Sequence, residues 1–315
     1  MAEKHVLVLI HGITPEKEPR PRDQYAPLID ALQRAHLPIE PPICQVCWGV
    51  PNLDGSIESE DQYLTPAEAF VGSLVADKAL KDVERAGVDW GIPGLRWGIR
   101  EVREGVVQYG LSDAIYYAAP EGEKLVRDSV FQQVFRKLEQ SEDGVMRLHL
   151  VAHSLGVTVA HDFLYALFGQ ADPHYPSEQG GQIDLKDENQ RLQDKWRACA
   201  QAGRLKLGSF VSYASQLPLF VMRKQALVKQ LARRERLDPR VIGIDPTRDR
   251  AQWAIFYDSD ELLGFATRAL YQDTPAIIDI NVNSGLDPYR AHVGYWKKPT
   301  IIQQTIAFLR ENMAG

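Results

Sequence analysis

Arg147-Leu-His-Leu-Val-Ala-His-Ser-Leu-Gly156 is the stretch of the chain that decides the fold. An apolar run ends here in a sharp turn at Ser154, and a helical pattern follows over residues 157–168. Ala152 and Gly156 lie two residues before and after the serine, where the chain doubles back and a large side chain would clash. The order strand, turn, serine, helix therefore predicts that one hydroxyl is held on the tightest bend of the chain.

This pattern resembles the nucleophile elbow of the α/β-hydrolase family, in particular that of its serine esterases and lipases, with alanine in place of the usual first glycine. The resemblance implies an α/β fold with a mostly parallel sheet and helices on both faces. It also implies hydrolysis through an acyl-enzyme on Ser154, with no metal and no organic cofactor. In this family the serine, the acid and the histidine follow in that chain order, each beyond the carboxyl end of a strand.

Other apolar runs agree with such a fold. Residues 6–10 form a short, continuous apolar run, which is typical of a strand buried on both faces of a parallel sheet. Further strands are predicted at 43–48, 205–213, 253–257 and 276–282. Helical patterns are found at 25–37, 121–140, 184–202, 220–237 and 300–312. Together they favour one domain over residues 1–315.

Two segments are expected to depart from the regular alternation. A helical insertion is predicted at about 50–120, with an amphipathic stretch at 66–85 and a second one after it. In the family that the chain resembles, such insertions cover the active site as a lid or cap, and a helical pair packed away from the site is the alternative. The polar segment at about 169–185 is rich in Gly, Pro, Ser and Asp, and it is expected to be a mobile loop.

His11-Gly12 follows the first predicted strand. In the family, a strand followed by His-Gly carries half of the oxyanion hole. The resemblance therefore implies that the backbone N–H of Ile13 points at the substrate oxygen, with the N–H of Leu155 as the second donor. A plain turn from strand to loop is the alternative interpretation of His11-Gly12.

A serine hydroxyl needs a histidine to take its proton and a carboxylate to orient that histidine. Of the eight histidines, His292 is the one that follows the acid candidates, between the last predicted strand and the last helix. Asp260 is the favoured acid, because it lies beyond the end of its strand and Asp260-Glu-Leu resembles the Asp-x-Val/Leu of lipase-like proteins. Asp258 is the alternative and Asp287 ranks third. The predicted triad is Ser154, Asp260 and His292.

Composition and net charge limit the classes of binding partner and the cellular compartment that are expected. The chain is 44 % hydrophobic and 25 % charged, as in ordinary globular proteins, and its net charge of −6 argues against nucleic acid. The basic residues at 223–236 are interpreted as a solvated helix face. Three cysteines fit a reducing compartment, and Cys44 and Cys47 would face opposite sides of a strand, so neither a disulfide nor a metal site is predicted. Without a leader peptide or a membrane span in the sequence, a cytoplasmic protein is expected, and transient contact with a lipid surface is a minor alternative.

The sequence therefore predicts a serine hydrolase that cleaves a carboxylic ester, with a small-molecule or lipid-like acyl substrate. Thioesterase, amidase and phospholipase activities use the same three residues, so they stay open as alternatives. A binding or signalling module that reuses a hydrolase fold without catalysis is the alternative from another class.

Overall fold

The computed structural model describes residues 3–12, 21–48, 120–142, 144–169, 185–221, 225–247, 250–261, 264–284, 291–292 and 294–314. The predicted insertion at about 50–120 lies outside the described residues, apart from its last residue. The same holds for most of the predicted polar loop at about 169–185.

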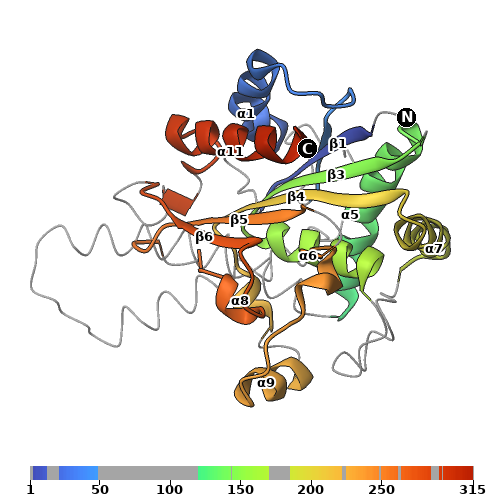
Figure 1. The fold of residues 1–315 in the computed structure, drawn as a ribbon, viewed down its shortest axis with the longest axis vertical. Helices are drawn as coiled ribbons and strands as arrows, with labels where there is room; N and C mark the ends of the chain where they lie inside the picture. Colours follow the sequence, from blue (N-terminus) through green and yellow to red (C-terminus); the bar gives the residue numbers. More distant parts are fainter. Residues whose placement is uncertain are drawn as a thin grey trace, which may run out of the picture.

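The described part is built on a six-stranded sheet in which every strand runs parallel to its neighbours (Figure 1). The strand order is β2-β1-β3-β4-β5-β6. The strands are β1 (Lys4–Ile10), β2 (Cys44–Val46), β3 (Met146–His153), β4 (Leu205–Tyr213), β5 (Gln252–Tyr257) and β6 (Ile277–Asn281). Each of them overlaps a segment in which the sequence predicts a strand, and β2 covers half of the predicted 43–48.

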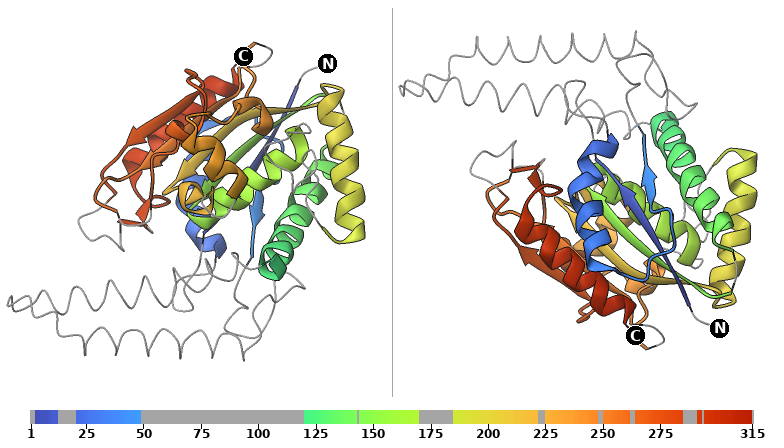
Figure 2. Two further views of the ribbon diagram at one scale, coloured as in Figure 1. Left: turned by 90° about the horizontal axis from the view of Figure 1, so that it is seen from below. Right: turned by 90° about the horizontal axis from the view of Figure 1, so that it is seen from above.

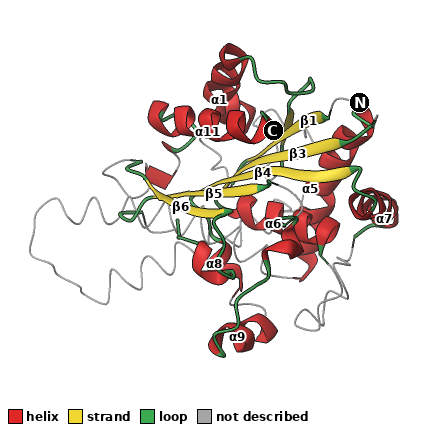
Figure 3. Ribbon diagram, viewed as in Figure 1, coloured by secondary structure: helices red, strands yellow, loops and turns green. Residues whose placement is uncertain are grey.

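Helices cover both faces of this sheet (Figures 1 and 2), and the three layers are also clear when the ribbon is coloured by secondary structure (Figure 3). The helices on one face are α1 (Pro21–Ala35) and α11 (Pro299–Met313), and those on the other are α5 (Pro120–Gln140), α6 (Leu155–Phe168) and α7 (Asp187–Gln201). Alternate residues of β1 belong to separate apolar clusters, with Val8 facing one layer and Leu9 the other. Burial on both faces explains the continuous apolar run, and the predicted α/β class is confirmed.

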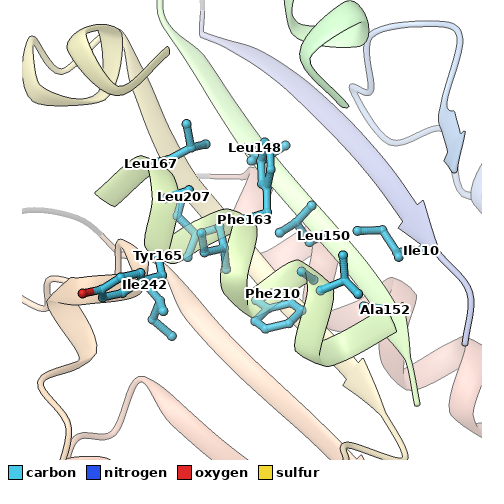
Figure 4. Close-up of a cluster of buried hydrophobic side chains, with 14 of the residues drawn as sticks. Ile10, Leu148, Leu150, Ala152, Phe163, Tyr165, Leu167, Leu207, Phe210 and Ile242 are labelled. Carbon is cyan, nitrogen blue, oxygen red and sulfur yellow. The ribbon is translucent and has the colours of Figure 1, made fainter. Parts of the chain in front are cut away.

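The helix that follows Ser154 is buried along nearly its whole length, from Leu155 to Leu167. Figure 4 shows Phe163 of this helix packed with Leu150 and Phe210 of the sheet beneath it. The Phe163 ring also meets Phe131 of α5 edge-on, with the ring centroids 4.9 Å apart. These contacts fix α6 on the sheet, and so they fix the position of the turn that precedes it.

One helical prediction is only partly met. The segment 220–237 includes the end of α8 (Leu217–Val221) and all of α9 (Gln225–Ala232), and α9 ends at Ala232 rather than at residue 237. Arg234 has a φ of 63°, a left-handed conformation that ends a helix, although the chain has no glycine at this point. None of the helices in the described ranges has both the length and the apolar character needed to cross a membrane.

The order in which the strands are added to the sheet reverses next to the sharp turn at Ser154. The chain goes from β1 to β2 on one side, and then returns to form β3 on the other side of β1. Ile10 at the end of β1 is in register with Ala152 near the end of β3. In open parallel sheets, ligands bind at the carboxyl ends of the strands where the strand order reverses. His11-Gly12 and Ser154 both lie at such a position.

Candidate active site

Ser154 lies between β3 and α6 with a φ of 55° and a ψ of −127°. For a residue with a side chain, such a conformation costs about 1–3 kcal/mol and persists only where the surroundings enforce it. The surroundings here include two backbone hydrogen bonds: Ser154 N–H donates to the Tyr213 carbonyl at 2.9 Å, and Val157 N–H donates to the Ser154 carbonyl at 3.0 Å. The sharp turn predicted at this serine is confirmed.

Two glycines permit the close approach of the elbow to the end of β1. A Cβ on Gly156 would lie 2.3 Å from the carbonyl oxygen of His11. A Cβ on Gly12 would lie 2.5 Å from the Cβ of Ser154. Neither neighbouring atom can move without shifting the backbone or the serine itself, so the predicted steric need for a small residue after Ser154 is met at Gly156.

His292 is the histidine that contacts Ser154. Its Nε2 lies 2.8 Å from Ser154 Oγ, so the structure brings together the two residues that the sequence predicts to act as a pair. His292 is helical, as is Ala291 before it, and its side chain is 13 % exposed. The Ser154 side chain is buried. The pair is therefore largely shielded from solvent, with the histidine as its exposed member.

The carboxylate beside His292 belongs to Glu261, and not to the predicted Asp260 or Asp258. His292 Nδ1–H donates to Glu261 Oε1, and the Tyr295 hydroxyl donates to Glu261 Oε2 at 2.7 Å. The Glu261 side chain has no exposed surface. A Cβ on Gly264 would come within 2.6 Å of Glu261 Oε2, so this glycine leaves room for the carboxylate.

Asp258 explains why Glu261, rather than Asp260, faces the histidine. Its Oδ1 accepts the Asp260 N–H at 3.0 Å, and the Glu261 N–H donates to its carbonyl at 3.2 Å, so the chain turns back on itself. This turn leaves Asp260 exposed and directs Glu261 inward. Only the spacing Asp-x-x-Glu after a strand could have indicated this in the sequence. The third acid candidate, Asp287, lies outside the described residues.

Asp258 also ties the segment after β6 to the end of β5. Its Oδ2 accepts the N–H of Ser284 at 2.6 Å and the hydroxyl of Ser284 at 2.8 Å. Burial opposes the charge on this carboxylate, but the hydrogen bonds from Asp260 and Ser284 outweigh it and lower the pKa of Asp258. Asp258 is therefore an ionised residue that holds the loops around the site, without touching His292 itself.

His153 supports His292 from the elbow side, a role that the sequence did not indicate. Its Nε2 lies 2.7 Å from the carbonyl oxygen of His292, which can only accept, so Nε2 carries the proton. The two rings lie 4.9 Å apart. Burial, with a further contribution from His292, lowers the pKa of His153 well below its usual range, so this histidine is neutral.

His11 plays a structural part at the predicted oxyanion loop. Its Nε2 accepts the Trp48 N–H at 3.1 Å, its Nδ1–H donates to the Gly12 carbonyl, and its own carbonyl accepts the indole N–H of Trp48 at 2.9 Å. Burial lowers the pKa of His11 to about 4. The neutral ring thus ties the end of β1 to the end of β2. The predicted oxyanion donor Ile13 lies outside the described residues.

Leu155, the other predicted oxyanion donor, is the first residue of α6. The first N–H groups of a helix have no acceptor within that helix, and the helix dipole favours negative charge at this end. The N–H of Leu155 therefore lies at the end of α6 where the helix dipole favours negative charge.

The cysteines contribute nothing to this site. All three are free thiols, and burial raises the pKa of Cys44 to about 12, which makes its thiolate scarce near neutral pH. The Sγ of Cys44 lies 3.9 Å from the carbonyl oxygen of Gln133 in α5. Within the ranges that the structure describes, no group of three His, Cys, Asp or Glu side chains is arranged to hold a metal ion.

Comparison with known proteins found no match, so a function has to be inferred from the geometry of the site. The chain matches no protein-family model, and it matches no curated protein at a significant level.

Proposed function

We propose that this protein is a serine hydrolase of α/β-hydrolase fold that cleaves a carboxylic ester through an acyl-enzyme on Ser154. One observation carries the proposal: Ser154 Oγ lies 2.8 Å from His292 Nε2, while the other ring nitrogen of His292 is bonded to the buried carboxylate of Glu261. In such an arrangement the histidine can take the serine proton, and the carboxylate fixes the tautomer and stabilises the imidazolium.

The reaction then follows from these contacts. Ser154 attacks the substrate carbonyl while His292 accepts its proton, and the N–H of Leu155 stabilises the negative oxygen, with Ile13 as the second proposed donor. His292 next protonates the leaving alcohol. A water molecule, deprotonated by His292, attacks the acyl-enzyme and releases the acid, which restores Ser154.

A second serine–histidine contact in the chain provides a comparison for the Ser154–His292 pair. Ser209 Oγ lies 2.8 Å from His149 Nδ1, but the other nitrogen of His149 contacts His5 rather than a carboxylate. Both residues of this pair lie inside strands and are fully buried, and burial lowers the pKa of His149 to about 3. Such a histidine is a poor base near neutral pH. The Ser154–His292 pair differs in three respects. Its serine lies in the turn between a strand and a helix, its histidine contacts a carboxylate, and that histidine is partly exposed.

This contrast supplies the experiment and its control. The purified chain is treated with a fluorophosphonate probe, and hydrolysis of p-nitrophenyl butyrate is followed. We expect labelling of the wild type, a Ser154→Ala variant that neither labels nor hydrolyses, and a Ser209→Ala variant that keeps both activities. Labelling and hydrolysis that survive in Ser154→Ala would refute the proposal, as would a wild-type chain that does neither.

The acyl group is a separate part of the proposal. A small-molecule or lipid-like carboxylic ester is the substrate class proposed here, and thioester, amide and phospholipid cleavage would use the same residues. Parallel assays with a butyryl ester, a butyryl thioester, a butyryl anilide and phosphatidylcholine vesicles distinguish them. The highest kcat/KM identifies the substrate class, and a rate that rises only in the presence of vesicles indicates an interfacial enzyme.

A further inference from the structure

Glu261 is held by two residues of a single helical turn. His292 donates to Oε1 and Tyr295 donates to Oε2, so both oxygens of the carboxylate are engaged from the same short segment. His292 and Tyr295 are three residues apart, a spacing that places two side chains on one side of a turn. The short segment that contains His292 therefore also contains Tyr295, which donates to the second oxygen of Glu261.

The environment of Glu261 makes the tyrosine hydroxyl important. The Glu261 side chain has no exposed surface, and in the part of the chain that the structure describes, its one ion-pair partner is His292. A buried carboxylate costs free energy unless its oxygens are hydrogen-bonded. The Asp258 carboxylate and the Ser284 hydroxyl also act on Tyr295, and neither adds a positive charge beside it.

Tyr295 is suited to act as a permanent donor. Burial, reinforced by the nearby Glu261 carboxylate, raises the pKa of Tyr295, so its hydroxyl stays protonated. Its ring is buried and stacks on Tyr213 of β4 at 5.8 Å. The backbone at Gly264 also lies near the carboxylate, since a Cβ built there would come within 2.6 Å of Oε2. The buried ring and the carboxylate are therefore both held by close neighbours.

We propose that Tyr295 is a positioning residue of the hydrolytic site, which acts through Glu261 and not on the substrate. Its hydroxyl holds Oε2 and so fixes the plane of the Glu261 carboxylate, so that His292 presents Nε2 to Ser154. This inference rests on the proposed function, since it assigns a role within the same site.

The test is a double-mutant cycle on p-nitrophenyl butyrate hydrolysis with Tyr295→Phe, Glu261→Gln and the double variant. Tyr295→Phe removes only one oxygen. We expect kcat to fall about 10- to 100-fold, a loss typical when a residue that orients a functional side chain loses its own hydrogen-bond partner. KM should change by less than about twofold. If Tyr295 acts through Glu261, the double variant loses no more than Glu261→Gln alone.

Tyr271→Phe is the matched control. Tyr271 is also a buried tyrosine with a hydrogen-bonded hydroxyl, but its partner is His161 and it packs in the apolar cluster on the opposite face of the sheet. This variant should keep wild-type kcat and KM. Melting curves of both phenylalanine variants, and the rate of fluorophosphonate labelling at Ser154, show whether a loss in Tyr295→Phe occurs in a folded protein.

The outcomes separate this inference from the proposed function. A Tyr295→Phe variant with at least half of the wild-type kcat, or losses that multiply in the double variant, would overturn the role of Tyr295. In both cases an inactive Ser154→Ala variant would leave the serine hydrolase proposal intact. Hydrolysis that persists in Ser154→Ala would instead remove the proposed function itself.

Discussion

The imidazole of His153 donates its Nε2–H to the main-chain carbonyl of His292 at 2.7 Å, so the residue before the serine holds the backbone of the histidine that contacts that serine. This bond joins the end of β3 to a segment 139 residues further along the chain. The distance between Ser154 and His292 is thus controlled from the serine side as well as from Glu261.

Replacement of this donor should affect turnover more than stability. In His153→Phe the hydrogen bond to His292 is lost, but so is the buried Nδ1, which has no hydrogen-bond partner among the described residues. We expect kcat to fall about tenfold, which corresponds to about 1.4 kcal/mol and lies within the range for one hydrogen bond, and the unfolding midpoint to change little. Steady-state kinetics and urea unfolding measure both effects. An unchanged kcat would show that His292 needs no such anchor.

The carboxylates after β5 should differ sharply in their contributions. Glu261→Gln removes the carboxylate beside His292 and, on the proposed function, is expected to reduce kcat about 10³- to 10⁴-fold, the loss typical of serine hydrolases that lack the acid of their triad. Asp260→Asn alters an exposed side chain and should have no effect. Asp258→Asn weakens the bonds to Ser284 and should lower stability by about 1–3 kcal/mol. Steady-state kinetics and urea unfolding of the three variants measure these effects. A larger loss of kcat in Asp260→Asn than in Glu261→Gln would contradict the assignment of Glu261.

Gly156 should not accept even one methyl group. In Gly156→Ala the new Cβ would meet the backbone oxygen of His11 at 2.3 Å, and a backbone atom cannot turn aside. We expect at least about 2 kcal/mol of destabilisation and loss of fluorophosphonate labelling. Gly144→Ala is the control: its Cβ would meet nothing within 4 Å, and only its φ of 82° opposes the change, at a cost of about 1–2 kcal/mol. Labelling should survive in the control.

Acid should destabilise the fold through its buried histidines. Burial is the main cause that lowers the pKa of His11 to about 4, that of His149 to about 3, and that of His153 well below its usual range. An unfolded chain takes up these protons near pH 6.5, whereas the folded chain does not until the pH is far lower. Folding stability is therefore fully present above about pH 7 and falls as the pH decreases from about 6.5 to 4, by up to about 1.4 kcal/mol per pH unit for each histidine.

Urea unfolding midpoints at pH 7.5, 6.0 and 5.0 measure this dependence. Replacement of the buried His149 by glutamine should flatten the decrease, and replacement of the exposed His36 by glutamine should not. Midpoints that stay constant down to pH 5 would show that these histidines are protonated in the folded protein.

Local sequence determined the framework and two members of the candidate site. Runs such as Val6 to Ile10 specify strands because a strand buried on both faces must be apolar at every position, whichever residues surround it. The elbow at Ser154 could be located because its steric demands fall on residues within two positions of the serine. His292 followed from chain order, since it is the one histidine in the sequence after the last predicted strand.

Tertiary structure alone decided which groups surround His292. The choice among Asp258, Asp260 and Glu261 depends on one turn after β5, and a change of a single residue in such a turn sends a side chain to the opposite side. The supporting bonds from His153 and Tyr295 join segments that the sheet brings together, so no local pattern encodes them. Sequence periodicity reports burial, whereas the direction of a buried polar side chain is set by the partners that satisfy its hydrogen bonds.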